Sequence, residues 1–87
     1  MTSKMKIKVL FFASARELVG DSMTELDVDS PTTTAAVVDL LCERFPKLSL
    51  IRTTIAIAVN RIYTKLSEPV ELKDGDEVAF LPPISGG

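Results

Sequence analysis

Residues 33–45, Thr-Thr-Ala-Ala-Val-Val-Asp-Leu-Leu-Cys-Glu-Arg-Phe, decide the fold because they hold the one clear helical pattern in the sequence. Their apolar side chains recur at the i, i+3, i+4 and i+7 spacing of a helix with one buried face, at Val38, Leu41, Cys42 and Phe45. Pro46 disfavours helical backbone before it, so we expect the helix to end there. Since Cys42 lies on the apolar stripe, we interpret it as a small buried hydrophobic residue rather than a reactive thiol.

Stretches that alternate between apolar and polar residues flank this helix on both sides and predict strands. Residues 6–13 and 22–28 precede the helix, and residues 55–60 and 77–81 follow it. A shorter strand is predicted near 62–66. The side chains expected to face the core are Ile7, Val9, Phe11, Thr24, Leu26, Val28, Ile55, Ile57, Val59, Val78 and Phe80.

Turn signals separate these elements. Ser14 to Gly20 predicts one helical turn, capped by Ser14 and ended by Gly20, and Asn60-Arg61 and Asp74-Gly75 predict tight turns. The order strand, strand, helix, strand, short strand, strand indicates one helix packed across one face of a mixed sheet. We therefore predict an α+β fold, a β-grasp or ubiquitin-like roll, formed by residues 1–87 as a single domain.

Composition argues against several classes of protein. The net charge is −2, with ten basic residues scattered along the chain, which is unlike a nucleic-acid-binding protein. The sequence has no histidine, the usual general base near neutral pH, and one cysteine, so we expect no metal site and no self-contained catalysis. The carboxylates of Asp74, Asp76 and Glu77 are interpreted as a solvated turn, and those of Asp27 and Asp29 likewise.

The N-terminal residues imitate a secretion signal without matching one. Lys4, Lys6 and Lys8 precede an apolar stretch that ends at Ala15, but the lysines interleave with apolar residues at strand period and the uninterrupted apolar stretch is short. No stretch approaches the ~20 apolar residues of a membrane span. We expect a cytoplasmic protein that does not enter membranes.

The last six residues predict an extended tail that leaves the domain after the strand at 77–81. Proline has no backbone N–H and cannot extend a sheet ladder, and terminal glycines leave a thread only as wide as the backbone. Six extended residues span about 20 Å, which suits a narrow channel in another protein. A bare carboxylate needs activation, most simply adenylation followed by attack of sulfur or an amine. The expected threading residues are Pro82, Pro83, Ile84, Ser85 and Gly86, and the reacting residue is Gly87.

An apolar patch is expected beside this tail. Leu10, Phe12, Ala79 and Leu81 lie, by strand parity, on the sheet face opposite the helix. The first and last strands are neighbours in a β-grasp, so these residues would form one exposed surface. Contiguous apolar patches on small proteins mark interfaces more often than chance exposure does, and we predict that this patch binds a partner.

Two segments carry a family resemblance. Residues 5–20, Met-Lys-Ile-Lys-Val-Leu-Phe-Phe-Ala-Ser-Ala-Arg-Glu-Leu-Val-Gly, and residues 74–87, Asp-Gly-Asp-Glu-Val-Ala-Phe-Leu-Pro-Pro-Ile-Ser-Gly-Gly, resemble the small, sulfur-carrying subunit of molybdopterin synthase. The Pro-Pro-x-x-Gly-Gly ending is the specific element. Related ubiquitin-like sulfur carriers for thiamine synthesis and tRNA thiolation share the Gly-Gly pair but typically lack the two prolines.

The resemblance implies a reaction cycle and two partners. An activating enzyme like those of the ubiquitin system consumes ATP and magnesium to adenylate Gly87, and a persulfide then replaces AMP to leave a thiocarboxylate. The tail enters the catalytic large subunit of a heterotetramer with two copies of each subunit, where sulfur passes to cyclic pyranopterin monophosphate. The resemblance adds Tyr63 to the residues expected to contact the partner. No cofactor stays bound to the chain itself.

Two other functions share these features. A protein modifier joined through Gly87 to lysines of its targets needs the same fold, tail and adenylation step. A plain interaction domain with an unreactive tail needs only the fold and the apolar patch. The sequence leaves both alternatives open.

Overall fold

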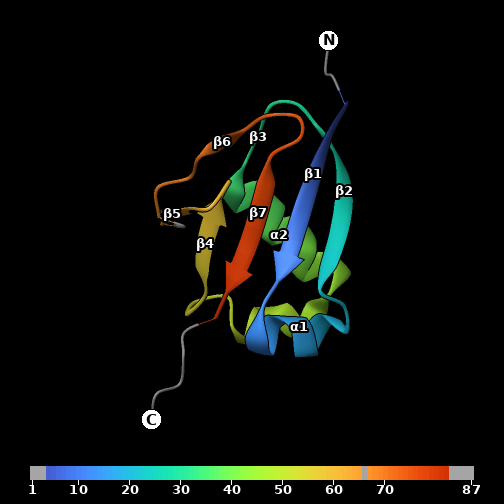
Figure 1. The fold of residues 1–87 in the computed structure, drawn as a ribbon, viewed down its shortest axis with the longest axis vertical. Helices are drawn as coiled ribbons and strands as arrows, with labels where there is room; N and C mark the ends of the chain where they lie inside the picture. The colour runs from blue at the N-terminus through green and yellow to red at the C-terminus, as the bar shows by residue number, and fades with distance from the viewer. Residues whose placement is uncertain (1–3, 66, 83–87) are drawn as a thin grey trace.

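A mixed five-stranded sheet forms the body of the protein, with the longer helix across one face and the first helix at the end where the first strand finishes (Figure 1). The structure is a computed structural model that describes residues 4–65 and 67–82. The strand order is β2-β1-β7-β4-β5; β1 and β7 pair in parallel, and the other neighbours are antiparallel. The β-grasp prediction is confirmed. The five strands are β1 (Lys4–Phe11), β2 (Met23–Asp29), β4 (Ala56–Val59), β5 (Ile62–Thr64) and β7 (Glu77–Leu81).

Helix α2 (Thr34–Arg44) lies across one face of the sheet, as its apolar periodicity predicts. Thr33 caps it, with its Oγ1 accepting a hydrogen bond from the N–H of Ala36 at 3.3 Å. Leu41 and Val38 are buried, but Cys42 is only half-buried against the core. Cys42 therefore lies on the predicted apolar face of α2, but its side chain is less buried than predicted. No helix in residues 4–65 and 67–82 is long and apolar enough to cross a membrane.

The segment after β1 differs from its prediction. Helix α1 spans Ala13–Val19, and Phe12, not Ser14, occupies its N-cap position without a side-chain hydrogen bond. The strand ends at Phe11 because Ala13 adopts a positive φ of 50°, which turns the chain sharply out of the sheet. Gly20 ends α1 as predicted, in a left-handed conformation with φ 88° and its N–H donating to the carbonyl of Arg16.

Three short elements have no counterpart in the prediction. A 3₁₀ helix, η1 (Pro46–Leu50), follows α2, and a second small sheet pairs β3 (Thr32–Thr33) with β6 (Glu71–Leu72). Elements of two residues are too short to show a sequence period. Buried Thr34 stabilises this second sheet, because its Oγ1 accepts from the N–H of Val70 at 3.1 Å and its own N–H donates to the Val70 carbonyl at 2.9 Å.

The core lies between the sheet and the helical layer. Phe11 is at its centre and makes edge-to-face contacts with Phe45 and Phe80, with ring centroids 6.0 and 5.7 Å apart. Of the side chains predicted to face inward, all are buried except Thr24 and Ile55, which are half-buried. Ile55 falls outside β4, which begins one residue later than predicted, and β5 ends at Thr64 instead of residue 66.

Candidate docking face

One row of apolar and aromatic side chains crosses all five strands on the sheet face opposite the helices. Each member is the Cα partner of the next in the sheet register, so the row is straight. The row consists of Met23, Leu10, Ala79, Ala58 and Tyr63, in the strand order β2-β1-β7-β4-β5. We call it the apolar row.

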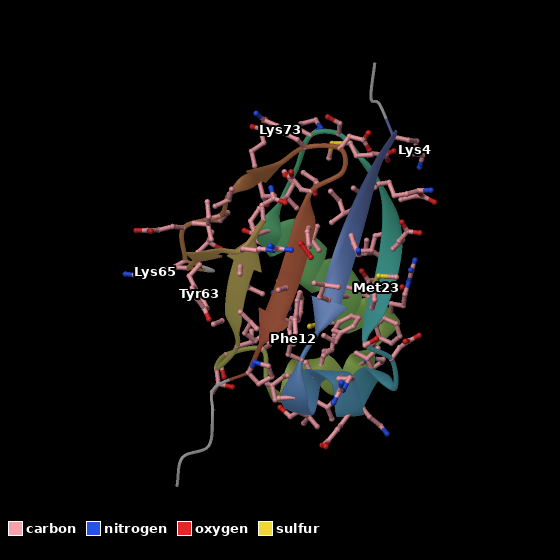
Figure 2. All side chains as sticks on the ribbon, in the orientation of Figure 1. Lys4, Phe12, Met23, Tyr63, Lys65 and Lys73 are labelled. Atoms are coloured by element: carbon pink, nitrogen blue, oxygen red, sulfur yellow. The ribbon has the colours of Figure 1, made fainter. Side chains whose placement is uncertain are left out.

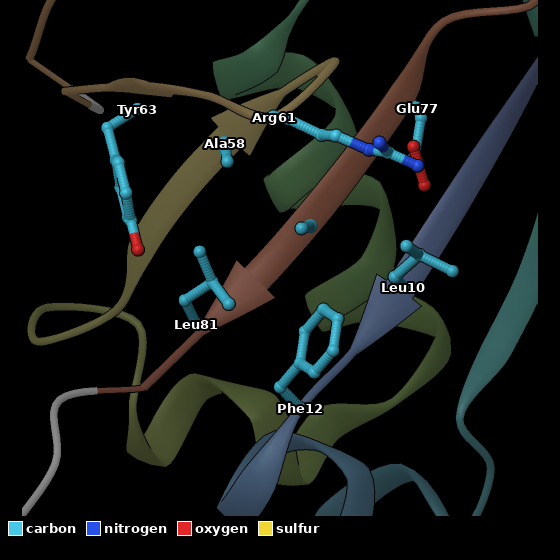
Figure 3. Close-up of a pocket in the computed structure, with 8 residues that line it drawn as sticks. Leu10, Phe12, Ala58, Arg61, Tyr63, Glu77 and Leu81 are labelled. Atoms are coloured by element: carbon cyan, nitrogen blue, oxygen red, sulfur yellow. The ribbon is translucent and has the colours of Figure 1, made fainter.

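Four members of the apolar row, Leu10, Ala79, Ala58 and Tyr63, line a hollow of about 350 Å³ (Figure 3). Phe12 and Tyr63 stand out from the surface, with 45% and 72% of their areas exposed. All five residues expected to contact a partner line this hollow, so the structure brings the predicted patch together. The complete lining is Leu10, Phe12, Ala58, Arg61, Tyr63, Glu77, Ala79 and Leu81.

Three lining residues were not predicted. Ala58 was expected on this face only as a small side chain, and it is buried, with 4% of its area exposed. Arg61 was assigned only to a turn, and Glu77 only to the outer face of β7. The position of Arg61 follows from the hairpin register, which pairs Val59 with Ile62 and thereby places the turn beside the hollow. Glu77 begins β7 and reaches the hollow from that strand.

The other half of the same sheet face is charged. Lysines on β1 are the Cα partners of carboxylates on β2, and Lys8 is also the Cα partner of Glu77 on β7. Figure 2 shows Lys4 and Lys73 at one end of the sheet and Phe12 toward the other. Exposed pairs of this kind add little stability; their effect is to confine the apolar surface to the end where β7 finishes. The pairs are Lys4 with Asp29, Lys6 with Asp27, and Lys8 with Glu25.

The β4–β5 hairpin turn is held firmly against β7. Asn60 and Arg61 both have positive φ, 50° and 73°, as a two-residue type I′ turn requires. The Nδ2 of Asn60 donates to the Oδ1 of Asp76 at 3.0 Å, and its Oδ1 accepts from the N–H of Glu77 at 3.0 Å. These bonds fix the position of Arg61 and Tyr63 relative to the hollow.

The carboxylates at 74–76 act as acceptors for backbone groups. Asp76 accepts from the N–H of Lys73 at 2.7 Å, and Asp74 accepts from the N–H of Lys6 at 2.7 Å. Gly75, with φ 86°, supplies the left-handed residue of the turn. These hydrogen bonds support the interpretation of the acidic residues as part of a turn. No group of three potential metal ligands occurs in the described part of the chain.

The chain leaves the sheet beside the hollow. Leu81 ends β7 and lines the hollow, and half-buried Pro82 follows it outside any strand. The N–H of Phe12 donates to the carbonyl of Phe80 at 3.2 Å, which holds the chain just after β1 to the end of β7. The rest of the predicted tail, Pro83, Ile84, Ser85, Gly86 and Gly87, lies outside the described residues, so its extended course and the role of Gly87 stay predictions.

The sequence and the fold are both similar to those of known proteins. A family model described as the ThiS family matches residues 9–87. The molybdopterin synthase sulfur carrier subunit of Aedes aegypti is 44% identical over 91 residues, covering 95% of this chain and 90% of the relative. Among solved structures, a complex of subunits 1 and 2 of molybdopterin-converting factor from Helicobacter pylori matches with a TM-score of 0.66 and 25% identity, covering 95% of this chain and 100% of the other.

A second kind of solved structure is also similar. The H. volcanii small archaeal modifier protein 1 matches with a TM-score of 0.79 and 26% identity, covering 92% of this chain and 99% of that one. The fold is thus shared by a subunit of molybdopterin-converting factor and by a protein that is named a modifier.

Proposed function

The chain belongs to the ThiS family, and on that premise we propose that it is the sulfur carrier subunit of a molybdopterin synthase. One observation carries the proposal: the apolar hollow adjoins the point where the chain leaves β7 toward a Gly-Gly terminus. A carrier needs a surface that docks and a terminus that reacts, and here the two are adjacent. The 44% identity to the Aedes aegypti subunit of that name favours this pathway over other ubiquitin-like carriers.

The proposed chemistry takes place at the carboxylate of Gly87. Its oxygen attacks the α-phosphorus of ATP and displaces pyrophosphate, with magnesium neutralising the phosphates, so that an acyl adenylate forms. The outer sulfur of a persulfide then attacks the acyl carbon and AMP leaves. A thiol that cleaves the resulting sulfur–sulfur bond is oxidised to a disulfide and releases Gly87 as a thiocarboxylate. An activating enzyme of the ubiquitin-activating type would supply the catalytic groups for these steps.

The loaded tail then delivers sulfur to cyclic pyranopterin monophosphate in the catalytic large subunit. The thiocarboxylate sulfur bonds to a carbon of the substrate and displaces an oxygen substituent, and water then hydrolyses the acyl–sulfur bond. This hydrolysis restores the carboxylate of Gly87 for another cycle, and two transfers complete the dithiolene of molybdopterin. The large subunit is proposed to form a heterotetramer with two copies of this chain. The hollow and the apolar row bind its surface, and residues 82–86 place Gly87 in its active site.

The chain is proposed to act without catalytic groups or a resident cofactor of its own. Its sequence has no histidine, and the carboxylates of Asp74 and Asp76 are engaged by backbone N–H groups. Its part is to bind, to orient its terminus and to dissociate for reloading. We place this cycle in the cytoplasm, with neither membrane nor nucleic acid as a partner.

A modifier function is the second candidate, because of the similarity to the H. volcanii modifier protein. It shares the adenylation step and differs only in the acceptor, which would be a lysine amine. Isopeptide-linked conjugates that disappear when Gly86 and Gly87 are deleted would favour it. A thiocarboxylate without such conjugates would favour the sulfur carrier.

Reconstitution tests the proposal. Thiocarboxylated protein is mixed with the large subunit and cyclic pyranopterin monophosphate, and molybdopterin is measured by its fluorescent oxidation product. We expect product with the natural terminus, and none with Gly87→Ala or with one residue added after Gly87, at unchanged thermal stability. Product formation by the extended chain would support the plain interaction domain.

A further inference from the structure

Among the described residues that line the hollow, Arg61 is the one with a cationic side chain. In Figure 3 it extends from the β4–β5 turn across β7 in the direction of Glu77, along the rim opposite Leu81 and Phe12. The other side chains of the lining are apolar or aromatic, apart from Glu77. A partner that fills the hollow will therefore bring its own surface against this guanidinium.

The charge of Arg61 is incompletely balanced within the chain. In the described part of the protein, Arg61 makes no ion pair and no side-chain hydrogen bond, whereas Lys4 pairs with Asp29 and Arg52 with Asp39. Glu77 is the nearest carboxylate in the lining, but it is also the Cα partner of Lys8. Lys8 has Glu25 as its other Cα partner, and no ion pair joins Arg61 to Glu77 in the described part of the chain, so the guanidinium is able to bind an external anion.

The fold does not require an arginine at this position. Arg61 has φ 73°, a left-handed conformation that suits glycine and that strains other L-residues. The second position of a type I′ turn normally holds glycine, and the bonds that anchor this turn come from Asn60 instead. A strained residue whose side chain makes no bond within the fold is a candidate for binding.

We propose that Arg61 is a specificity-determining residue of the docking face, and that its guanidinium binds a carboxylate on the large subunit. This inference rests on the proposed function, which supplies the partner. A planar guanidinium binds a carboxylate through two parallel hydrogen bonds. Apolar side chains of the large subunit fill the hollow, and the carboxylate lies at its rim, across β7, where the guanidinium ends. A surface lacking that acid would leave Arg61 partly desolvated and unpaired, and would be rejected.

Binding to the purified large subunit tests the inference with four variants of the full chain. Arg61→Gly removes the side chain and relieves the backbone, so it should fold at least as stably as the natural protein while binding about tenfold more weakly. Arg61→Glu should bind more weakly still, and Arg61→Lys should recover part of the loss. The control is Lys47→Glu on η1, which makes the same change in net charge but lies in an element packed against the helices, and it should bind normally.

The dependence on salt provides a second readout. The difference in Kd between the natural protein and Arg61→Gly should shrink as ionic strength rises, since the lost interaction is electrostatic. Equal Kd values within twofold for the natural protein, Arg61→Gly and Arg61→Glu would overturn the inference while leaving the proposed function intact. Failure of the natural protein itself to bind the large subunit would instead overturn the proposed function, and the inference with it.

An intrachain role for Arg61 makes a different prediction. If the guanidinium served only to hold the turn against Glu77, Arg61→Gly and Glu77→Gln would each lower the melting temperature, and the double variant would lower it no further. Affinity would then follow stability across all the variants. That result would overturn the inference.

Discussion

Leu10 of β1 and Ala79 of β7 are Cα partners in the parallel pair that joins the first and last strands of the sheet. This pairing places the beginning of the chain beside the strand that leads to its C-terminus. The side chain of Leu10 and the neighbouring Phe12 therefore form the docking face next to the proposed reactive tail. Parallel pairing of β1 with β7 is thus the structural basis of the function that we propose.

Charge placed in the hollow should abolish docking without unfolding the protein. Phe12 and Leu81 line the hollow and lie outside the buried core. Phe12→Glu and Leu81→Glu should therefore each weaken binding to the large subunit by about 100-fold, because an unpaired charge replaces a central apolar contact. Leu50→Glu is the matched control, since Leu50 on η1 is 77% exposed and away from the hollow. Titration calorimetry measures affinity and circular dichroism the fold. Unchanged affinity of both hollow variants would show that the partner docks elsewhere.

Truncation of a core side chain should lower the stability of the fold, whereas truncation of an exposed side chain in the hollow should not. Phe80 is buried and stacks edge-to-face on Phe11, so Phe80→Ala should lower the free energy of unfolding by about 3–5 kcal/mol. Tyr63→Ala, at a position with 72% exposure, should change it by less than about 0.5 kcal/mol. Urea denaturation followed by circular dichroism gives both values. Comparable losses for the two variants would mean that Tyr63 contributes to the core and not only to the surface.

Loss of the Asn60 side chain should loosen the hairpin beside the hollow. Asn60→Ala removes the hydrogen bonds to Asp76 and to the Glu77 backbone and leaves alanine with a positive φ, so it should cost about 2 kcal/mol. Asn60→Gly removes the same bonds but tolerates the backbone, and should cost less. Hydrogen exchange at the amide of Glu77 should accelerate in both variants. Protection equal to that of the natural protein would contradict the role we assign to Asn60.

Periodic patterns predicted the larger elements because one face of each is covered. The alternation at 77–81 matches β7 residue for residue, with Val78 and Phe80 buried. The stripe at 33–45 places α2 to within one residue at each end. Parity then placed Leu10, Phe12, Ala79 and Leu81 on the outer face, where the structure finds them lining one hollow.

Features that depend on register or on isolated contacts could not be predicted. The β3–β6 pair is two residues long and shows no period, and Pro46 marks the end of α2 without indicating that a 3₁₀ helix buries Leu48 next. The place of Arg61 beside the hollow follows from the pairing of β4 with both β5 and β7. A local turn signal contains no information about that pairing.

The intact mass of the protein after incubation with the host's activating enzyme, ATP, magnesium and a persulfide donor tests the central claim most directly. We predict a mass increase equal to the replacement of one oxygen by sulfur. The increase should occur in the natural chain and in the control variant Phe80→Leu, which changes the core and keeps the terminus, and it should be lost when Gly87 is removed. The mass should return to its starting value once the large subunit and cyclic pyranopterin monophosphate are added. An unchanged mass, with an enzyme shown to activate another carrier in the same buffer, would contradict the account.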